Sequence, residues 1–162
     1  MPNEHAKVLV IGLGNELRGD DALGRIAARR LRLLVDPAEV DVIDQTAPVP
    51  EMAEPIAGST LVVFLDASSE GSIGEVVSRR LNDPDSAQAM THRCNPQTLV
   101  GLARCLYGHA PPAFAITCRG CTFDFNNCSL SQPVASACDM IVQATLAIIA
   151  NERQIDACGV NL

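Results

Sequence analysis

Two aspartates, Asp20 and Asp21, stand side by side in a glycine-rich loop near the start of the chain. They follow a run of branched apolar residues over 8–11, which is typical of a strand covered on both faces in a parallel sheet. Gly12 and Gly14 allow the chain to turn sharply where this strand ends. Because carboxylates in such a turn attract cations or act as bases, the loop indicates a metal site.

Two nucleotide-binding interpretations of this loop are disfavoured. A dinucleotide fingerprint needs a third glycine where the chain has Leu17, and Glu16, Asp20 and Asp21 would repel a phosphate. A Walker loop is excluded because no Gly-Lys-Ser/Thr sequence follows.

A helix is expected to begin at Asp20, with Asp20 as its N-cap. Asp21 would then lie in the first turn, where the helix dipole favours the ionised carboxylate. Glu16 is expected to be a solvated loop residue near the rim of the site. The apolar face of this helix is predicted from helical spacing at Leu23, Ile26, Ala27, Leu31 and Leu34.

A second carboxylate, Asp66, closes the continuous apolar strand predicted over 60–66. A lone aspartate at this position could simply cap the following turn. If the first and third strands are parallel, however, Asp66 and Asp21 reach the same edge of the sheet, where ligands bind in open α/β sheets.

His92 is the histidine with a candidate role, because it lies in a loop on the connection that leaves the fourth strand. His5 lies in a terminal tail and His109 in a turn, so both are expected at the surface. Two carboxylates and one imidazole would suit a divalent ion such as nickel, zinc or iron. Taken alone, a loop histidine is more often solvated than ligating.

The chain contains seven cysteines, an odd number that argues against a secreted disulfide scaffold. The spacing of Cys118, Cys121 and Cys128 does not match a four-cysteine zinc ribbon, although a redox or metal role stays open. Cys105 and Cys138 fall within predicted helices and are expected to be buried. The chain has no GxSxG or HExxH motif, so serine hydrolysis and ordinary zinc proteolysis lack their markers.

The predicted elements alternate between strands and helices, except for two consecutive strands in the middle. This order predicts an α/β fold, a three-layer sandwich with a mostly parallel, roughly five-stranded twisted sheet flanked by helices on both faces. We expect one domain over residues 1–162. The remaining strands are predicted at 39–44, 74–80 and 113–117, the remaining helices at 50–57, 96–107 and 131–152, and a loop at 82–95.

The charge balance limits the partners. A formal net charge of −7 argues against nucleic acid or an anionic membrane surface. The longest apolar runs, such as 61–65 and 144–150, are far shorter than the roughly 20 residues of a membrane span. Glu4 also lies where a signal peptide would carry positive charge, so we expect a cytoplasmic protein.

Across nearly its whole length, the chain resembles the hydrogenase maturation proteases. These endopeptidases trim the C-terminal extension from the large-subunit precursor of [NiFe] hydrogenase. The resemblance rests on the segment 12–21 with Gly24, on Phe64-Leu-Asp66-Ala67, on Thr91-His92 ahead of Pro96 and Leu99, and on Leu106-Tyr-Gly108 before the last strand.

The resemblance implies that Asp21, Asp66 and His92 are the catalytic and nickel-binding residues. It also implies that the nickel is carried by the substrate rather than held permanently, and that the partner is the hydrogenase precursor. The chain departs from many relatives at Ala22, where they have glycine, and at its cysteines 118, 121 and 128.

Two other functions compete with this one. The first is a non-enzymatic nickel or zinc carrier that uses the same three ligands or the cysteines. The second is a peptidyl-tRNA hydrolase, which has a similar opening segment. That family needs a catalytic histidine where this chain has Gly-Asp-Asp-Ala at 19–22, and the basic surface expected for tRNA is absent.

Overall fold

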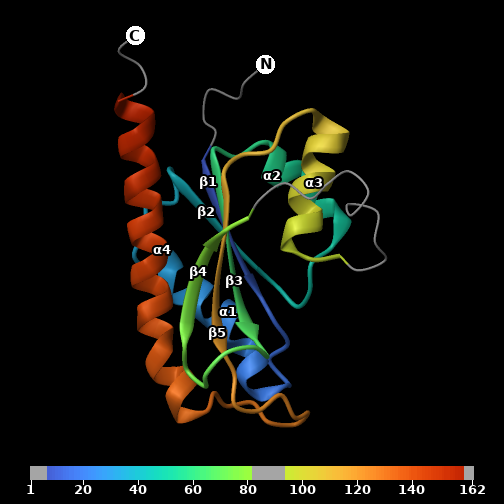
Figure 1. Cartoon of the computed structure of the whole chain (residues 1–162), viewed down its shortest axis with the longest axis vertical. Coiled ribbons are helices and arrows are strands. Elements are labelled where there is room, and N and C mark those ends of the chain that lie inside the picture. Colours follow the sequence, from blue (N-terminus) through green and yellow to red (C-terminus); the bar gives the residue numbers. More distant parts are fainter. Residues whose placement is uncertain (1–6, 82–93, 159–162) are drawn as a thin grey trace.

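The computed structural model describes residues 7–81 and 94–158. The chain alternates between strands and helices as predicted (Figure 1). In chain order the elements are β1 (Val8–Leu13), the 3-10 helix η1 (Gly19–Ala22), α1 (Leu23–Arg32), β2 (Val40–Gln45), the 3-10 helix η2 (Pro50–Met52), α2 (Ala53–Ala57), β3 (Leu61–Ser68), β4 (Val76–Arg80), α3 (Pro96–Tyr107), β5 (Ala113–Arg119) and α4 (Gln132–Cys158).

The sheet has five strands in the order β2-β1-β3-β5-β4. The strands β2, β1, β3 and β5 run parallel, and β4 pairs antiparallel with β5 at the edge. Helix α1 follows β1 on one face of the sheet, whereas the chain after β3 forms the edge strand β4 and then α3 on the other face. Neighbouring strands with diverging connections form the crevice in which open α/β sheets bind ligands, so the topology places a candidate site beyond β1 and β3.

Helices cover both faces of the sheet, which confirms the predicted three-layer sandwich. Helices α1 and α4 pack on one face, and α2 and α3 pack on the other (Figure 1). The buried strand β3 contributes to both sides, with Val63 and Leu65 toward α1 and α4, and Val62 and Phe64 toward α2 and α3. This two-sided burial explains why β3 is a continuous apolar run.

Helix α1 approaches the sheet through two glycines. A Cβ atom added to Gly24 would lie 2.1 Å from the carbonyl oxygen of Leu65 and 2.4 Å from that of Leu13. A Cβ atom added to Gly12 would lie 2.4 Å from the carbonyl oxygen of Gly24. Because real Cβ atoms do not make such contacts, both positions require glycine if the backbone of α1 is to pack directly over β1 and β3.

The caps of α3 follow the predicted boundaries. The side chain of Asn95 accepts a hydrogen bond of 2.9 Å from the backbone N–H of Thr98, and the Thr98 side chain accepts one from the N–H of Asn95. Gly108 ends the helix in the left-handed conformation, with φ of 74°. A capping box at the start and glycine at the end define this helix locally.

Two burial assignments from the sequence were wrong. Leu34 is 61% exposed because α1 ends at Arg32, before the helical spacing could place Leu34 on the inner face. Cys105, in α3, is also exposed. The reason lies in the neighbouring helix: α2 has five residues, about 7.5 Å, and cannot accompany all twelve residues of α3.

Among the described residues, one helix is long and apolar enough to cross a membrane, over Gln132–Ile155. The sequence analysis missed it because polar residues interrupt its apolar runs. The inner side of this helix belongs to the core cluster of the sheet, with Val134, Cys138, Ile141 and Ile149 all buried. This contact with the sheet is typical of a core helix rather than of a membrane span.

Candidate functional site

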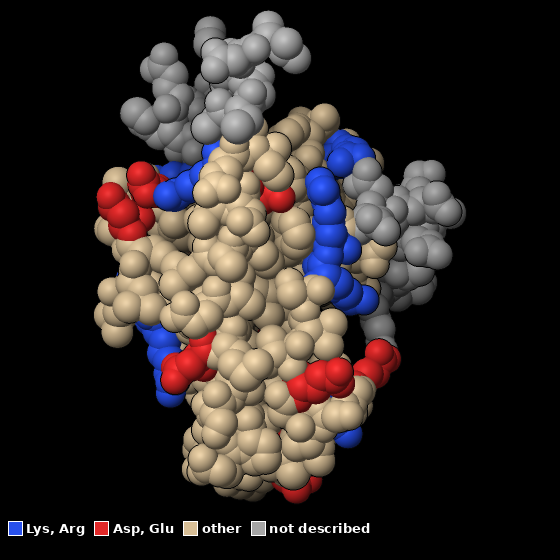
Figure 2. All heavy atoms as spheres, turned by 60° about the vertical axis from the view of Figure 1, so that its left-hand side comes forward, with Lys and Arg blue, Asp and Glu red and all other residues tan. Residues whose placement is uncertain are grey.

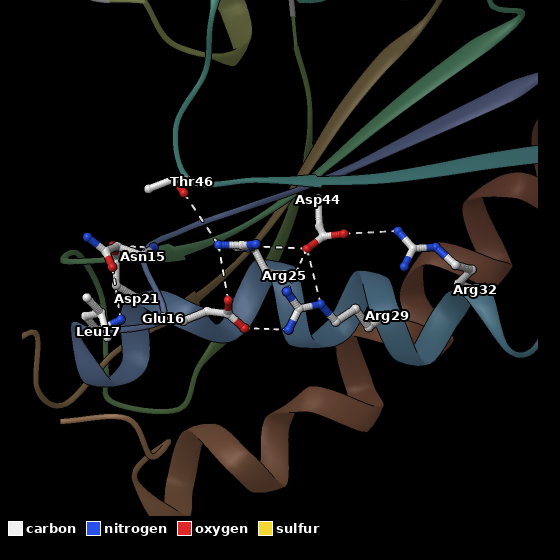
Figure 3. Close-up of polar contacts among 9 residues, drawn as sticks. All are labelled: Asn15, Glu16, Leu17, Asp21, Arg25, Arg29, Arg32, Asp44 and Thr46. Atoms are coloured by element: carbon white, nitrogen blue, oxygen red, sulfur yellow. Dashed lines mark hydrogen bonds and ion pairs between the residues drawn. The ribbon is translucent and has the colours of Figure 1, made fainter. Parts of the chain in front are cut away.

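The loop after β1 places Asp21 at the carboxyl edge of the sheet. Gly14 and Gly19 take positive φ angles of 136° and 54°, which let the chain reverse into η1. Asp21 lies within η1, and its Oδ2 atom accepts a 2.9 Å hydrogen bond from the backbone N–H of Asn15 (Figure 3). The carboxylate of Asp21 is therefore oriented by its own loop.

Asp20 is not the N-cap of α1, contrary to the prediction. The cap position belongs to Ala22, because η1 runs directly into the helix. The Asp20 carboxylate is fully buried instead, and it accepts hydrogen bonds from the backbone N–H groups of Cys121, Thr122 and Ser131 and from the Ser131 hydroxyl, at 2.6–3.1 Å. It joins the β1–η1 loop to the segment that connects β5 with α4.

The pKa of Asp20 reflects this arrangement. Burial alone would raise the pKa, but the hydrogen bonds from Ser131, Cys121 and Thr122 stabilise the ionised form and hold the pKa below 3.8. Asp20 is therefore a buried, charged residue that holds two loops together through its hydrogen bonds. The interpretation of Asp20 as structural stands, with a different role from the one expected.

Asp66 lies at the end of β3, beside Asp21. Strands β1 and β3 are parallel, with Gly12 opposite Leu65, so both carboxylates reach the same edge. Burial raises the pKa of Asp66 from 3.8 to about 7, the Ala67 N–H lowers it through a 2.8 Å hydrogen bond, and the negative charge of Asp21 raises it further. The structure thus brings the two predicted carboxylates together and leaves one of them poised near neutral pH.

The third predicted ligand, His92, lies outside the described residues. Helix α3 begins a few residues later, and Pro96 at its start lines the same hollow as Asp66. Within residues 7–81 and 94–158, no three His, Cys, Asp or Glu side chains are grouped so that they could hold a metal ion. The metal set of Asp21, Asp66 and His92 therefore stays a prediction.

The hollow beside Asp66 has a volume of about 300 Å³. It lies on the α2 and α3 side of the sheet, where the carboxyl ends of β3 and β5 extend past the start of α3. Its walls include polar and charged side chains from three strands and their loops. They are Asp66, Ser68, Ser69, Glu70, Arg79 and Thr117.

An ion-pair network that the sequence analysis missed supports the loop from behind (Figure 3). Asp44 at the end of β2 pairs with Arg25, Arg29 and Arg32 of α1 at 2.9–3.2 Å. Glu16 pairs with Arg25 at 3.3 Å and with Arg29. A signal existed in the arginines three and four residues apart on α1, but their partner on β2 is visible only in three dimensions.

The network lowers the pKa values of both of its acids. The hydrogen bond from Arg29 holds the pKa of Glu16 below its usual value. Burial would raise the pKa of Asp44, but its three arginine partners lower it overall. Figure 3 shows Glu16 directed toward α1 and Asp21 on the other side of the loop. Glu16 therefore fixes the loop to α1 and is not part of the pair formed by Asp21 and Asp66.

The cysteines with described side chains are free thiols. Cys138 is buried as predicted, and so is Cys118, whereas Cys121 and Cys128 are exposed. Burial raises the pKa values of the Cys118 and Cys138 thiols, which disfavours the reactive thiolate at these two positions.

The raised pKa of Asp66 predicts how stability depends on pH. A carboxyl group with a folded-state pKa above its unfolded-state value stabilises the fold in its protonated form, fully below about pH 4, and this stability is lost as the pH rises to about 7. We therefore expect the Tm of the metal-free protein to fall over this range relative to the Asp66→Asn variant, which calorimetry with a chelator would measure. A constant Tm difference would contradict it.

The fold is that of the hydrogenase maturation endopeptidases, which confirms the predicted resemblance at the level of fold. The chain is similar to the hydrogenase maturating endopeptidase HybD from E. coli, with 21% identity, a TM-score of 0.70 and 90% of this chain and 93% of that chain covered. It is similar to a hydrogenase 2 maturation peptidase from a Thaumarchaeota archaeon, with 28% identity, a TM-score of 0.70 and coverage of 89% and 98%.

A third similar structure is the [NiFe] hydrogenase maturation protease HycI from Thermococcus kodakarensis. It has 22% identity and a TM-score of 0.71, and the alignment covers 91% of this chain and 95% of that chain. No family model matches the sequence, and no curated protein matches it. The relationship is therefore carried by structure more than by sequence.

Proposed function

We propose that the protein is an endopeptidase that removes the C-terminal extension from the large-subunit precursor of a [NiFe] hydrogenase after nickel insertion. The observation that carries this proposal is the pair of carboxylates, Asp21 and Asp66, at the carboxyl edge of β1 and β3 in a fold shared with hydrogenase maturation endopeptidases. The precursor is the partner, and the protein acts on it in the cytoplasm. The free thiols support a reducing compartment.

In this proposal the nickel belongs to the substrate. Asp21, Asp66 and His92 bind the nickel ion of the loaded precursor and fix the scissile peptide bond beside it. The pKa of Asp66 near 7 suits a group that exchanges a proton for a cation, because the approach of a positive charge favours the ionised carboxylate. One carboxylate then serves as general base for a water that attacks the peptide carbonyl, without a serine or cysteine nucleophile.

The surroundings of the carboxylates support a protein substrate. Leu17, Val49, Ile73 and Phe125 are 39–67% exposed, and each lies in a loop that follows a parallel strand. Exposed apolar side chains around a polar centre are typical of a surface that binds another protein. The side chain of Arg18 holds Phe125 in place through a cation–π contact of 5.0 Å.

The proposal is tested by incubating the protein with a nickel-loaded large-subunit precursor and, separately, with the same precursor lacking nickel. We expect mass spectrometry to show loss of the C-terminal peptide from the loaded precursor alone. Cleavage of both precursors would contradict recognition of nickel. Failure to cleave either of them, together with tight binding of free nickel, would favour the carrier function.

A further inference from the structure

A polar area on the sheet continues from Asp66 to the strand at the edge. Alternate residues of a strand share one face of a sheet, and the register aligns Asp66 of β3 with Thr117 of β5 and Val77 of β4. One row away, Phe64, Ala115 and Arg79 are aligned in the same way. Both rows of residues lie on the face of the sheet that α2 and α3 cover only in part.

Two hollows of about 300 Å³ each adjoin on this face. They share Ser68, Glu70, Arg79 and Thr117, so they form one groove, which we name the β3–β4 groove. The groove begins at Asp66 and crosses β5 to β4, which is the edge strand of the sheet. Strands lie about 4.8 Å apart, so the groove is about 10 Å long and matches about three residues of an extended peptide.

Some charged side chains of the groove form hydrogen bonds within the described part of the protein, and others do not. The Glu75 Oε2 atom accepts a 2.9 Å hydrogen bond from the Ser72 N–H, and the Arg119 guanidinium donates one of 2.6 Å to the Gly120 carbonyl. Glu70 and Arg79 line both hollows and are exposed, and no described residue forms a hydrogen bond or ion pair with the side chain of Arg79. Figure 2 brings the α4 side of the molecule forward, and on that side Lys and Arg side chains form a column with Asp and Glu side chains below it.

We infer that the β3–β4 groove binds an extended segment of the precursor next to the scissile bond, and that Arg79 pairs with an acidic side chain of this segment. The inference rests on the proposed function, because it assigns the partner of the same site. Asp66 and Glu70 would repel an acidic side chain elsewhere in the groove, so such a side chain is best placed in direct contact with the Arg79 guanidinium. Arg79 would thus select the substrate without taking part in the chemistry.

The test compares Arg79→Glu with Arg80→Glu. Arg80 is the next residue on the same strand, directs its side chain to the opposite face and stacks over Phe114 at 5.9 Å, so it offers the same change of charge outside the groove. We expect Arg79→Glu to raise both the Kd for nickel-loaded precursor and the KM of processing by roughly tenfold, with kcat little changed. Arg80→Glu should match the wild type.

A complementary exchange identifies the partner of Arg79. Acidic residues of the precursor near the scissile bond are replaced by lysine one at a time, and one replacement should weaken binding to the wild type but restore binding to Arg79→Glu. Equal Kd values for wild type and Arg79→Glu would overturn the inference. If the wild type binds the precursor through Arg79 but does not cleave it, the groove stands and the proposed function fails.

Discussion

Replacement of Asp21 by asparagine is expected to abolish processing of the nickel-loaded precursor while leaving the fold intact. Asparagine keeps an oxygen that accepts the hydrogen bond from the Asn15 N–H, so the loop is held as before. The negative charge is lost, and with it the attraction for the substrate nickel. We expect the processing rate to fall by roughly 100-fold or more, measured by mass spectrometry of the released peptide.

The same loss is expected for Asp66→Asn. Asp139→Asn serves as the control, because Asp139 is an exposed carboxylate on α4, paired with Arg30 far from the groove. It should process the precursor at the wild-type rate. Circular dichroism should show the same secondary structure in all three variants. Complete processing by Asp21→Asn would rule out a role for its charge in the reaction.

Replacement of Asp20 by alanine is expected to cost about 3 kcal/mol of unfolding free energy. The change removes a buried charge that accepts four hydrogen bonds, and it leaves the N–H groups of Cys121, Thr122 and Ser131 without their acceptor. Urea denaturation would measure the loss. The stability of this protein then depends strongly on one side chain that does not belong to the apolar core.

Asp124→Ala is the matched control for this change. Asp124 lies in the segment between β5 and α4 that Asp20 contacts, but it is exposed, and it accepts a hydrogen bond from the Thr122 hydroxyl at the surface. We expect a loss below about 0.5 kcal/mol. An equally small loss for Asp20→Ala would contradict a special role of Asp20 in joining the two loops.

The sequence predicted the features that depend on neighbouring residues. The strand before Gly12 and the helix that begins at Pro96 are each indicated by a short segment of the sequence, and both appear in the structure. The approach of Asp66 to Asp21 required one further assumption, that β1 and β3 are parallel, and the register confirms it. These predictions succeeded because the apolar pattern of a buried strand and the proline and glycine that bound a helix are local signals.

The roles of Asp20 and Asp44 could not be predicted in this way. The hydrogen-bond donors to Asp20 lie 101–111 residues further along the chain, so an aspartate at a helix start looked like an N-cap. Asp44 ends an ordinary strand, and its arginine partners are recognisable only after α1 is laid beside β2. The roles of both aspartates are thus set by contacts with distant parts of the chain, and not by the preferences of neighbouring residues.

Gly24 has a consequence for altering the specificity of this protein. The main chain of α1 at Gly24 rests between the carbonyl oxygens of Leu13 and Leu65, so backbone atoms determine the spacing of the two strands that carry the carboxylates. Substitutions among the side chains of the core therefore leave that spacing unchanged. Under the proposed function, a variant selective for a different ion would have to be sought at Asp21 and Asp66, where the proposed ligands can be exchanged without moving the strands.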